Sequence, residues 1–365
     1  MSLNHQYIPS AVQLLQALIA TPSFSREEER TAAQIEQFLR RARVAYKQQD
    51  NNVWATSKYW KEGRPVLLLN SHHDTVKPVE SWQRDPFEAK LEGERLYGLG
   101  SNDAGASLVA LIATFLHFYE VKDLPFNLIL AATAEEEISG AKGIAALLPE
   151  LGPIDCGIVG EPTQLQMAVA EKGLMVVDGL ARGQAGHAAR QEGENALYKA
   201  MEAIQQLQQF QFHKTSDLLG PTLLQITQIQ AGHQHNVVPD RCSFVIDIRT
   251  NEQYSNQEVL KLLQEKVKVE LKARSFRLNS SYIALDHPLV QQGKKLGMST
   301  FGSPTLSDQA LMPFPTLKLG CGDSARSHTA DEYINITELE QGIKTYIHLL
   351  EGLAQSGQVL PKHHS

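Results

Sequence analysis

Seven side chains in this sequence combine residue types that bind metal ions with positions where such ions could bind. Imidazole and carboxylate groups are the usual ligands of zinc and of related divalent ions. Most of these side chains follow a short apolar segment with the length and composition of a buried β-strand. In chain order the candidates are His72, Asp74, Asp103, Glu136, Glu137, Glu161 and His328.

The pattern of apolar segment and polar ligand recurs along the chain. Taken alone, an acid or histidine after a strand is usually a cap or a surface residue, and adjacent acids usually begin a solvated helix. Asp103 equally fits a helix N-cap, because it precedes a helix expected over 104–119. Repetition favours one shared site, since ligands bind beyond the carboxyl ends of strands in open α/β sheets. The segments are 66–69 before His72 and Asp74, 127–132 before Glu136 and Glu137, and 156–159 before Glu161.

One arrangement of two divalent ions uses five of the candidates as ligands. Asp103 would bridge the two ions. His72 and Glu161 would complete the ligands of one ion, and Glu137 and His328 those of the other. Mixed imidazole and carboxylate ligands suit two Zn²⁺ ions, with Co²⁺ or Mn²⁺ as alternatives. Two such ions can activate water and polarise a carbonyl oxygen, which indicates hydrolysis.

The remaining two candidates suit supporting roles in that chemistry. Glu136 is next to the expected ligand Glu137 and could take a proton from the attacking water and pass it to a leaving amine. Asp74 is placed to accept the second N–H of the His72 ring and so to orient it.

Composition excludes several classes of protein. The chain has 365 residues, a formal charge of -7 and no block of Lys or Arg, which argues against nucleic acid as a partner. No apolar run approaches the roughly 18 residues that a membrane span needs, so no membrane partner is expected. The first seven residues lack the pattern of a secretory signal, and Cys156, Cys242 and Cys321 are too scattered for a disulfide framework. We therefore expect a cytoplasmic protein.

The order of elements predicts an α/β protein with a second domain inserted into the first. A helix over 10–20 and a second one capped by Ser25 precede the strands already named. After Lys172 the pattern changes to alternating strands, in the order βαββαβ, which predicts a small antiparallel sheet covered on one face by two helices. The expected domains are 1–171 with 285–365, and 172–284. The inserted strands are 174–181, 223–230, 242–249 and 275–283, and the inserted helices are 194–210 and 256–269.

Five motifs together resemble the acetylornithine deacetylase and succinyl-diaminopimelate desuccinylase family of di-zinc amidohydrolases and aminoacylases. The resemblance covers nearly the whole chain. It implies the ligand roles above, Glu136 as general base, and a three-layer di-zinc peptidase-like catalytic domain. It also implies that the inserted domain is a ferredoxin-like lid and dimerisation domain. The motifs are 71–76, 98–103, 133–140, 160–163 and His328.

The resemblance extends to three residues of the inserted domain. His187 follows a glycine as in the family's Gly-His motif, which implies that it reaches across a homodimer and stabilises the oxyanion in the partner's active site. Asn236 begins the family's Asn-x-x-Pro motif. Arg249 matches a strand arginine that the family uses for the substrate's α-carboxylate, a contact that suits a bidentate guanidinium.

These resemblances predict hydrolysis of an Nα-acyl amino acid, with N-acetylornithine, a substrate of arginine biosynthesis, as the expected one. The alternatives are an N-succinyl amino-acid desuccinylase acting on succinylornithine or succinyl-diaminopimelate, an N-acetylcitrulline deacetylase and a dipeptidase. Departures from the family pattern at Leu99, 104–106 and Glu135 leave the acyl group open. A non-catalytic binding relative is disfavoured, because Glu136 and all five expected ligands are present.

Overall fold

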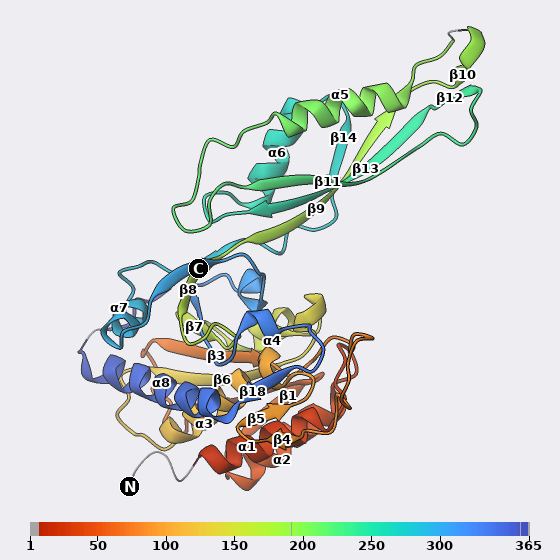
Figure 1. Cartoon of the computed structure of the whole chain (residues 1–365). Coiled ribbons are helices and arrows are strands. Elements are labelled where there is room, and N and C mark those ends of the chain that lie inside the picture. Colours follow the sequence, from red (N-terminus) through yellow and green to blue (C-terminus); the bar gives the residue numbers. More distant parts are fainter. Residues whose placement is uncertain (1–6, 191, 358, 364–365) are drawn as a thin grey trace. The chain divides into compact units, whose positions relative to one another are not determined.

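The computed structural model describes residues 7–190, 192–357 and 359–363, and these form two compact units (Figure 1). The main unit comprises the described residues within Met1–Val169, Tyr282–Phe301 and Ser307–Ser365, and the inserted unit comprises those within Ala170–Ser281 and Gly302–Leu306. The expected insertion over 172–284 thus differs at both bounds. It also lacked Gly302–Leu306, which belongs to the inserted unit.

A mixed β-sheet forms the centre of the main unit. Strand β3 is parallel to both β6 and β7, and β17 is parallel to β7, so the carboxyl ends of these strands lie along one edge. Strand β2 is antiparallel to β6, and β8 is antiparallel to β17. The order is β1 (Tyr46–Gln49), β2 (Asn52–Thr56), β6 (Asn127–Thr133), β3 (Val66–His72), β7 (Cys156–Val159), β17 (Thr316–Lys318), β8 (Met167–Glu171) and β15 (Ser281–Tyr282), and β16 (Thr300–Ser303) pairs with β8.

Helices cover both faces of this sheet, which confirms the predicted three-layer α/β fold. Leu68 lies in an apolar cluster with residues of α4 (Ile144–Leu151) and with Phe314. Leu67 and Leu69 point to the opposite face, because side chains alternate along a strand. That face is covered by α3 (Ala106–Phe118), against which α1 (Ile8–Ile19) and α8 (Ile336–Gln355) pack. Helix α2 (Glu29–Arg41) packs on β1 and β2, and α7 (Pro288–Lys295) on α8.

The predicted cap at Ser25 is wrong. Helix α2 begins at Glu29, its N-cap residue is Glu28, and no side chain caps it. The Ser25 hydroxyl instead donates a hydrogen bond to Asp74 Oδ2 at 2.7 Å. A tertiary contact with a buried carboxylate has therefore replaced the local hydrogen bond that the sequence favoured.

A second, small antiparallel sheet joins the strand just before α8 to two strands that precede α3. Strand β18 (Tyr333–Asn335) pairs with β5 (Arg95–Tyr97), which pairs with β4 (Leu91–Glu92). Helix α3 begins two residues later than expected, after a π-type turn, η2 (Ser101–Gly105), and its N-cap is Gly105 rather than Asp103. The pairing places the segment after His328 beside the turn that contains Asp103.

The inserted unit has the expected βαββαβ order in an antiparallel sheet. Its strands and helices are β9 (Gly173–Arg182), α5 (Ala196–Gln208), β11 (Leu223–Ala231), β13 (Arg241–Thr250), α6 (Asn256–Lys266) and β14 (Glu270–Ala273), with the sheet order β11-β13-β9-β14. Alternate residues of β13, such as Phe244 and Ile246, are buried in one cluster with residues of both helices. A separate pair of strands, β10 (Gly186–His187) and β12 (Val237–Val238), extends from this unit.

The fourth inserted strand was misplaced by the sequence pattern. We expected it over 275–283, but the strand that pairs with β9 is Glu270–Ala273. Ser281–Tyr282 belongs to the sheet of the main unit instead. Helix α6 accordingly ends at Lys266 rather than at 269, which leaves room for the turn into β14.

The helices of the described part of the chain include none that is long and apolar enough to cross a membrane. Residues 1–6, on which the expectation about a secretory signal partly rests, lie outside the described residues.

We predict that His287 makes the main unit less stable in acid. Its Nδ1 accepts the backbone N–H of Leu289 at the start of α7, and its Nε2 is buried without a hydrogen-bond partner in the described structure. Burial lowers the pKa of His287 to about 4, and this effect outweighs the negative charge of Asp286, which raises the pKa. Because the folded pKa lies below the unfolded value, this contribution to stability is complete above about pH 6.5 and is lost as the pH falls towards 4.

His287→Asn keeps an acceptor for the helix but removes the titrating ring. The fall in the free energy of unfolding between pH 7 and pH 4.5, measured by urea denaturation, should shrink by about 2 kcal/mol. The matched control is His348→Asn on the exposed face of α8, which should leave the pH dependence unchanged. Equal pH dependence in wild type and His287→Asn would contradict the prediction.

Candidate metal centre

The predicted ligands come together at the carboxyl edge of the parallel strands. His72 is the last residue of β3, and Glu137 and Glu161 lie in the segments that follow β6 and β7. His328 lies in the loop that follows β17. These strands are neighbours in the order β6-β3-β7-β17, so four separate stretches of sequence supply side chains to one place.

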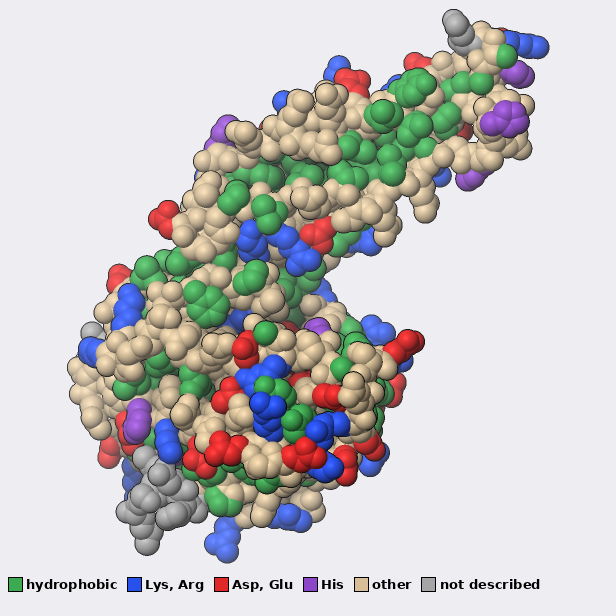
Figure 2. Space-filling view, viewed as in Figure 1, with side chains coloured by type: hydrophobic (Ala, Val, Ile, Leu, Met, Phe, Trp, Pro, Cys, Tyr) green, Lys and Arg blue, Asp and Glu red, His purple; other side chains and the backbone are tan. Residues whose placement is uncertain are grey.

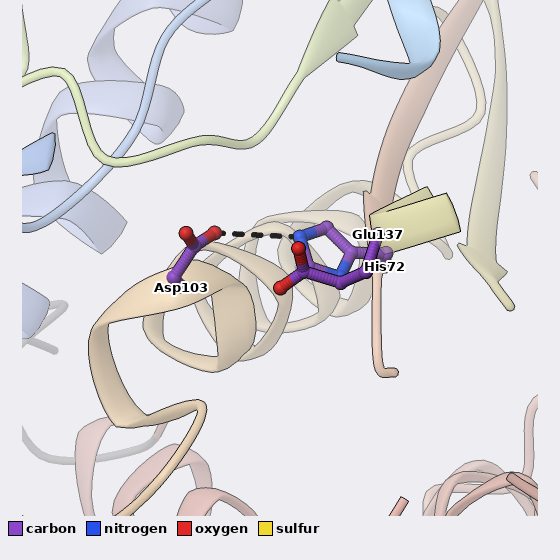
Figure 3. A group of neighbouring side chains, drawn as sticks. All are labelled: His72, Asp103 and Glu137. Carbon is purple, nitrogen blue, oxygen red and sulfur yellow. Dashed lines mark ion pairs between the residues drawn. The ribbon is translucent and has the colours of Figure 1, made fainter. Parts of the chain in front are cut away.

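Asp103 lies between the two histidines. Its Oδ1 is 3.5 Å from His72 Nε2, and its Oδ2 is 3.7 Å from His328 Nε2. Figure 3 shows the Asp103 carboxylate directed at the His72 ring, with Glu137 beside them. Each oxygen of one carboxylate thus faces a different imidazole, which is the geometry that a bridging ligand requires.

The other two acids divide between the histidines. Glu161 Oε1 is 3.7 Å from His72 Nε2, and Glu137 Oε2 is 2.9 Å from His328 Nε2. The closest contacts therefore join His72 to Glu161 and His328 to Glu137, with Asp103 shared. Wider groupings also exist, since ligand atoms of His72, Asp103 and Glu137 lie within 4.8 Å of one another, and so do those of His72, Glu136 and Glu161. The two groups share His72.

Buried atoms of this cluster lack hydrogen bonds. In the described part of the chain, His72 Nε2 and Glu161 Oε1 are among the buried side-chain atoms that have no hydrogen-bond partner. Leaving a buried polar atom unpaired costs about 1 to 3 kcal/mol. Both atoms point into the space that the carboxylates surround, so a cation there would satisfy them. The donor set and its orientation therefore fit divalent metal ions.

The electrostatics of the cluster also favour cations. Burial raises the pKa of Glu136 and Glu137, and it raises that of Glu161 to about 8 despite the nearby His72. Burial opposes a charge on His72, yet the surrounding carboxylates, Glu136 foremost, raise its pKa well above its usual value. The hydrogen bond with Glu137 raises the pKa of His328 to about 9. Without a cation, burial and the neighbouring acids thus oppose ionisation of these carboxyl groups, and a bound cation would favour their ionised form.

Asp74 has a broader role than the one expected of it. The Nδ1 of His72 donates to the backbone carbonyl of Asp74 at 3.0 Å, while the Asp74 carboxylate is 3.4 Å away. That carboxylate accepts the backbone N–H of Glu136 at 3.0 Å and that of Glu137 at 3.2 Å. The backbone of Asp74 thus orients His72, and its side chain holds the turn that carries Glu136 and Glu137.

Sequence reasoning missed three buried acids around the site. Glu28 accepts the backbone N–H of Glu135, and Asp308 accepts hydrogen bonds from the side chains of Asn70 and Thr133. Glu332 accepts backbone N–H groups of the turn that contains Asp103. Glu332 follows His328 closely in the sequence, which is a usable signal.

The residues expected from the inserted domain lie at opposite ends of its sheet. His187 pairs with Val237 in the β10-β12 ribbon, and the carbonyl of Asn236 accepts the N–H of Ala188, so His187 and Asn236 are close neighbours. Arg249 lies near the other end of β13, opposite Leu174, and its guanidinium makes an ion pair with Asp247 at 2.8 Å.

Comparisons of the sequence with known proteins identify a family and several relatives. The sequence model of Peptidase family M20/M25/M40 matches residues 68–352. The chain is 30% identical to acetylornithine deacetylase of Klebsiella pneumoniae, over 90% of this chain and 93% of that protein. It is 25% identical to succinyl-diaminopimelate desuccinylase of Gluconobacter oxydans, over 80% of this chain and 82% of that protein.

Solved structures share the fold. An aminopeptidase PepT from Bacillus cereus is similar with a TM-score of 0.74 at 18% identity, over 95% of this chain and 99% of the other. A dinuclear metal-binding M20 peptidase from Bacillus subtilis is similar with a TM-score of 0.73 at 17% identity, over 96% of this chain and 99% of the other.

We predict that Asp74→Asn weakens metal binding. The asparagine side chain has one acceptor oxygen, so its amide nitrogen would meet the N–H of Glu136 or Glu137, and the turn would shift. The affinity of the metal-depleted protein for Zn²⁺, measured by competition with a chelator, should fall by about tenfold. Ser25→Ala is the matched control, because it removes only the hydroxyl that donates to the same carboxylate, and its effect should be much smaller. Wild-type affinity in Asp74→Asn would refute the role of this carboxylate.

Proposed function

The chain belongs to peptidase family M20/M25/M40 and is a metal-dependent amidohydrolase, and we propose that it hydrolyses the amide bond of an Nα-acyl amino acid, N-acetylornithine first of all. The observation that carries the proposal is the Asp103 carboxylate, whose two oxygens face two different histidines. That geometry suits a pair of divalent ions, which we propose to be Zn²⁺, with Co²⁺ or Mn²⁺ able to replace them. His72 and Glu161 would hold one ion with Asp103, and Glu137 and His328 the other.

The proposed reaction depends on Glu136 for proton transfer. When bound, two divalent ions supply Lewis acidity to the amide carbonyl and lower the pKa of water. Glu136 is the acid of the cluster that this arrangement leaves free of an ion, and its Oε2 lies 3.9 Å from His72 Nε2. Its carboxylate would take a proton from water as the water oxygen bonds to the carbonyl carbon. As the C–N bond breaks, the same group would deliver that proton to the departing amine.

The position of Glu136 suits this task because its backbone is fixed. The Asp74 carboxylate accepts its N–H, and Glu28 accepts the N–H of Glu135 just before it. A general base must remain within hydrogen-bond reach of its proton, so a fixed turn favours turnover.

The choice of substrate rests on the relatives. Identity is higher to the acetylornithine deacetylase than to the succinyl-diaminopimelate desuccinylase, at 30% against 25%. We therefore propose N-acetylornithine as the substrate and an N-succinyl amino acid as the second candidate. Arg249 would bind the α-carboxylate that both substrates carry, and the Asp247 carboxylate would hold the guanidinium in place.

We further propose that the inserted unit forms a homodimer and acts as a lid. Its strand β11 is at an edge of the sheet and next to α5, and an unpaired strand edge readily pairs with a second chain. Apolar side chains gather along this unit (Figure 2), and Tyr198 and Met201 on α5 are 68% and 55% exposed. Ile229 on β11 is 49% exposed. An apolar helix face beside an open strand edge suits an interface between two copies.

The dimer would bring His187 and Asn236 to the partner's metal centre. Strand β13 extends from Arg241 to Thr250, which is roughly 30 Å at about 3.3 Å per residue. Arg249 lies near one end, and His187 lies beyond the other. One small substrate cannot contact both ends of the same sheet, so we propose that Arg249 serves its own subunit and His187 the partner's, where it stabilises the oxyanion.

We predict release of acetate and ornithine from N-acetylornithine by the Zn²⁺-loaded protein. N-succinylornithine, N-acetylcitrulline, N-succinyl-diaminopimelate and a dipeptide should be tested in parallel, with free amine measured by mass spectrometry. Glu136→Gln is the matched control, and it should keep the bound metal while losing turnover by at least about a hundredfold. If the protein prefers a succinyl substrate, the acyl group is succinyl and not acetyl. If none of the compounds is hydrolysed, the proposed function is wrong.

We predict that two inactive variants restore activity when they form mixed dimers. His187→Ala and Glu136→Gln should each be nearly inactive alone, with their metal retained. In a refolded equal mixture, half of the dimers are mixed, and each would contain one complete site, so turnover should reach about a quarter of the wild-type value. If the mixture stays as inactive as its components while mixed dimers are present, His187 does not act across the interface.

A further inference from the structure

Glu332 is a buried acid that no step of the proposed reaction uses. Its side chain is 2% exposed, and it immediately precedes β18. One carboxylate oxygen, Oε1, accepts the backbone N–H of Asn102 at 2.8 Å and that of Asp103 at 2.9 Å. The other oxygen, Oε2, accepts the N–H of Gly100 at 3.1 Å. A single side chain therefore binds three backbone groups of the turn that carries Asp103.

This turn leaves some of its own backbone N–H groups without a local acceptor. Asp103 has φ -117° and ψ 99°, which are not helical values, and Gly100 is left-handed with φ 76°. The N–H groups of Asn102 and Asp103 lie in the first turn, where no preceding helical carbonyl can accept them, although they are buried or nearly so. An acceptor from elsewhere in the chain must take its place, because unpaired buried N–H groups are costly. Glu332 is that acceptor.

The same contacts join the turn to the loop that carries His328. The backbone carbonyl of Glu332 accepts the N–H of Gly98 at 3.0 Å. The side chain of Asn102 in turn accepts the N–H of Asp323 at 2.9 Å and donates to its carbonyl at 3.1 Å. Asp323 and Glu332 lie on either side of His328 in the sequence. The turn with Asp103 and the loop with His328 are therefore fixed to each other at two points.

Buried carboxylates hold the other acidic turn of the site in the same way. Asp74 accepts the N–H groups of Glu136 and Glu137, and Glu28 accepts that of Glu135. A carboxylate is suited to this use because both its oxygens only accept hydrogen bonds. A glutamine at the same place would present an amide nitrogen to one of the N–H groups.

We propose that Glu332 is a positioning residue of the metal centre. Its carboxylate fixes the turn 100–103 so that Asp103 Oδ1 faces His72 while Oδ2 faces His328. The inference rests on the proposed pair of metal ions. It states that the affinity of the protein for both ions depends on Glu332, although Glu332 is not a ligand of either ion. Because Asp103 is shared, loss of Glu332 weakens both ions together.

The test compares metal binding by wild type and Glu332→Gln. Metal-depleted protein is titrated with Zn²⁺ against a chelator, and the visible absorption spectrum of the Co²⁺-loaded protein is recorded. In Glu332→Gln both ions should bind at least about tenfold more weakly, and the Co²⁺ spectrum should change. At saturating Zn²⁺, kcat should fall while KM stays near the wild-type value, because Glu332 is placed to act on Asp103 and not on the substrate.

The neighbouring Asp331 provides a matched control. Its Oδ1 also accepts two backbone N–H groups, but they are those of Gln83 and Arg84 and not those of the turn 100–103. Asp331→Asn should bind Zn²⁺ within about twofold of wild type. An equal loss of affinity in both variants would mean that Glu332 acts only through general stability, and it would overturn the inference.

Two further outcomes keep the inference separate from the proposed function. If wild type binds two ions and Glu332→Gln binds them equally well, the positioning role is wrong while the di-metal centre stands. If wild type binds fewer than two ions, the di-metal centre fails and the inference with it. Should Glu332→Gln fail to fold, Glu332→Asp decides, since it keeps the charge but is too short to reach all three N–H groups. Wild-type affinity in Glu332→Asp would overturn the proposal.

Discussion

Parallel pairing of β6, β3, β7 and β17 is the constraint on which the rest of this molecule depends. Because the strands point the same way, the segments that follow them meet at one edge, and residues from four distant stretches of sequence become neighbours. A parallel sheet must be covered on both faces, which explains why α3 and α4 lie on opposite sides of it and why every residue of β3, β6 and β7 is buried.

The site at that edge concentrates acidic side chains in a place with little solvent. Asp103, Glu136, Glu137 and Glu161 surround two histidines, and further buried carboxylates lie behind them. The supporting acids Asp74, Glu28 and Glu332 each accept backbone N–H groups of an acidic turn, and Asp74 also lies 3.4 Å from His72. Among the acids that face the centre, Glu161 has a buried oxygen, Oε1, with no hydrogen-bond partner in the described residues. The supporting acids thus bind backbone N–H groups, whereas the acids that face the centre are available to bind a cation.

The sequence indicated which side chains come together better than it indicated the local structure around them. His72, Glu137 and Glu161 could be found because each follows an uninterrupted apolar run, and such runs are a direct signal of buried strands. His328 and Asp103 were found with the help of motif spacing. The contacts of Ser25 and Glu332 could not be predicted, because each depends on a partner far away in the chain. The fourth inserted strand was misplaced because 275–283 and Glu270–Ala273 are both weakly patterned, and only pairing with β9 decides between them.

The position of β17 has a consequence for the order in which the molecule is completed during synthesis. This strand lies between β7 and β8, yet it is made after the whole inserted unit. Until Thr316–Lys318 has been synthesised, the edges of β7 and β8 that face β17 have no partner, and the side chains that follow β3 and β7 lack both His328 and the segment that holds Asp103. The inserted unit, by contrast, lies almost entirely within one continuous stretch and can fold while the remainder is still being translated. The side chains of His72, Asp103, Glu137 and Glu161 are therefore joined by that of His328 only after the whole inserted unit has been made.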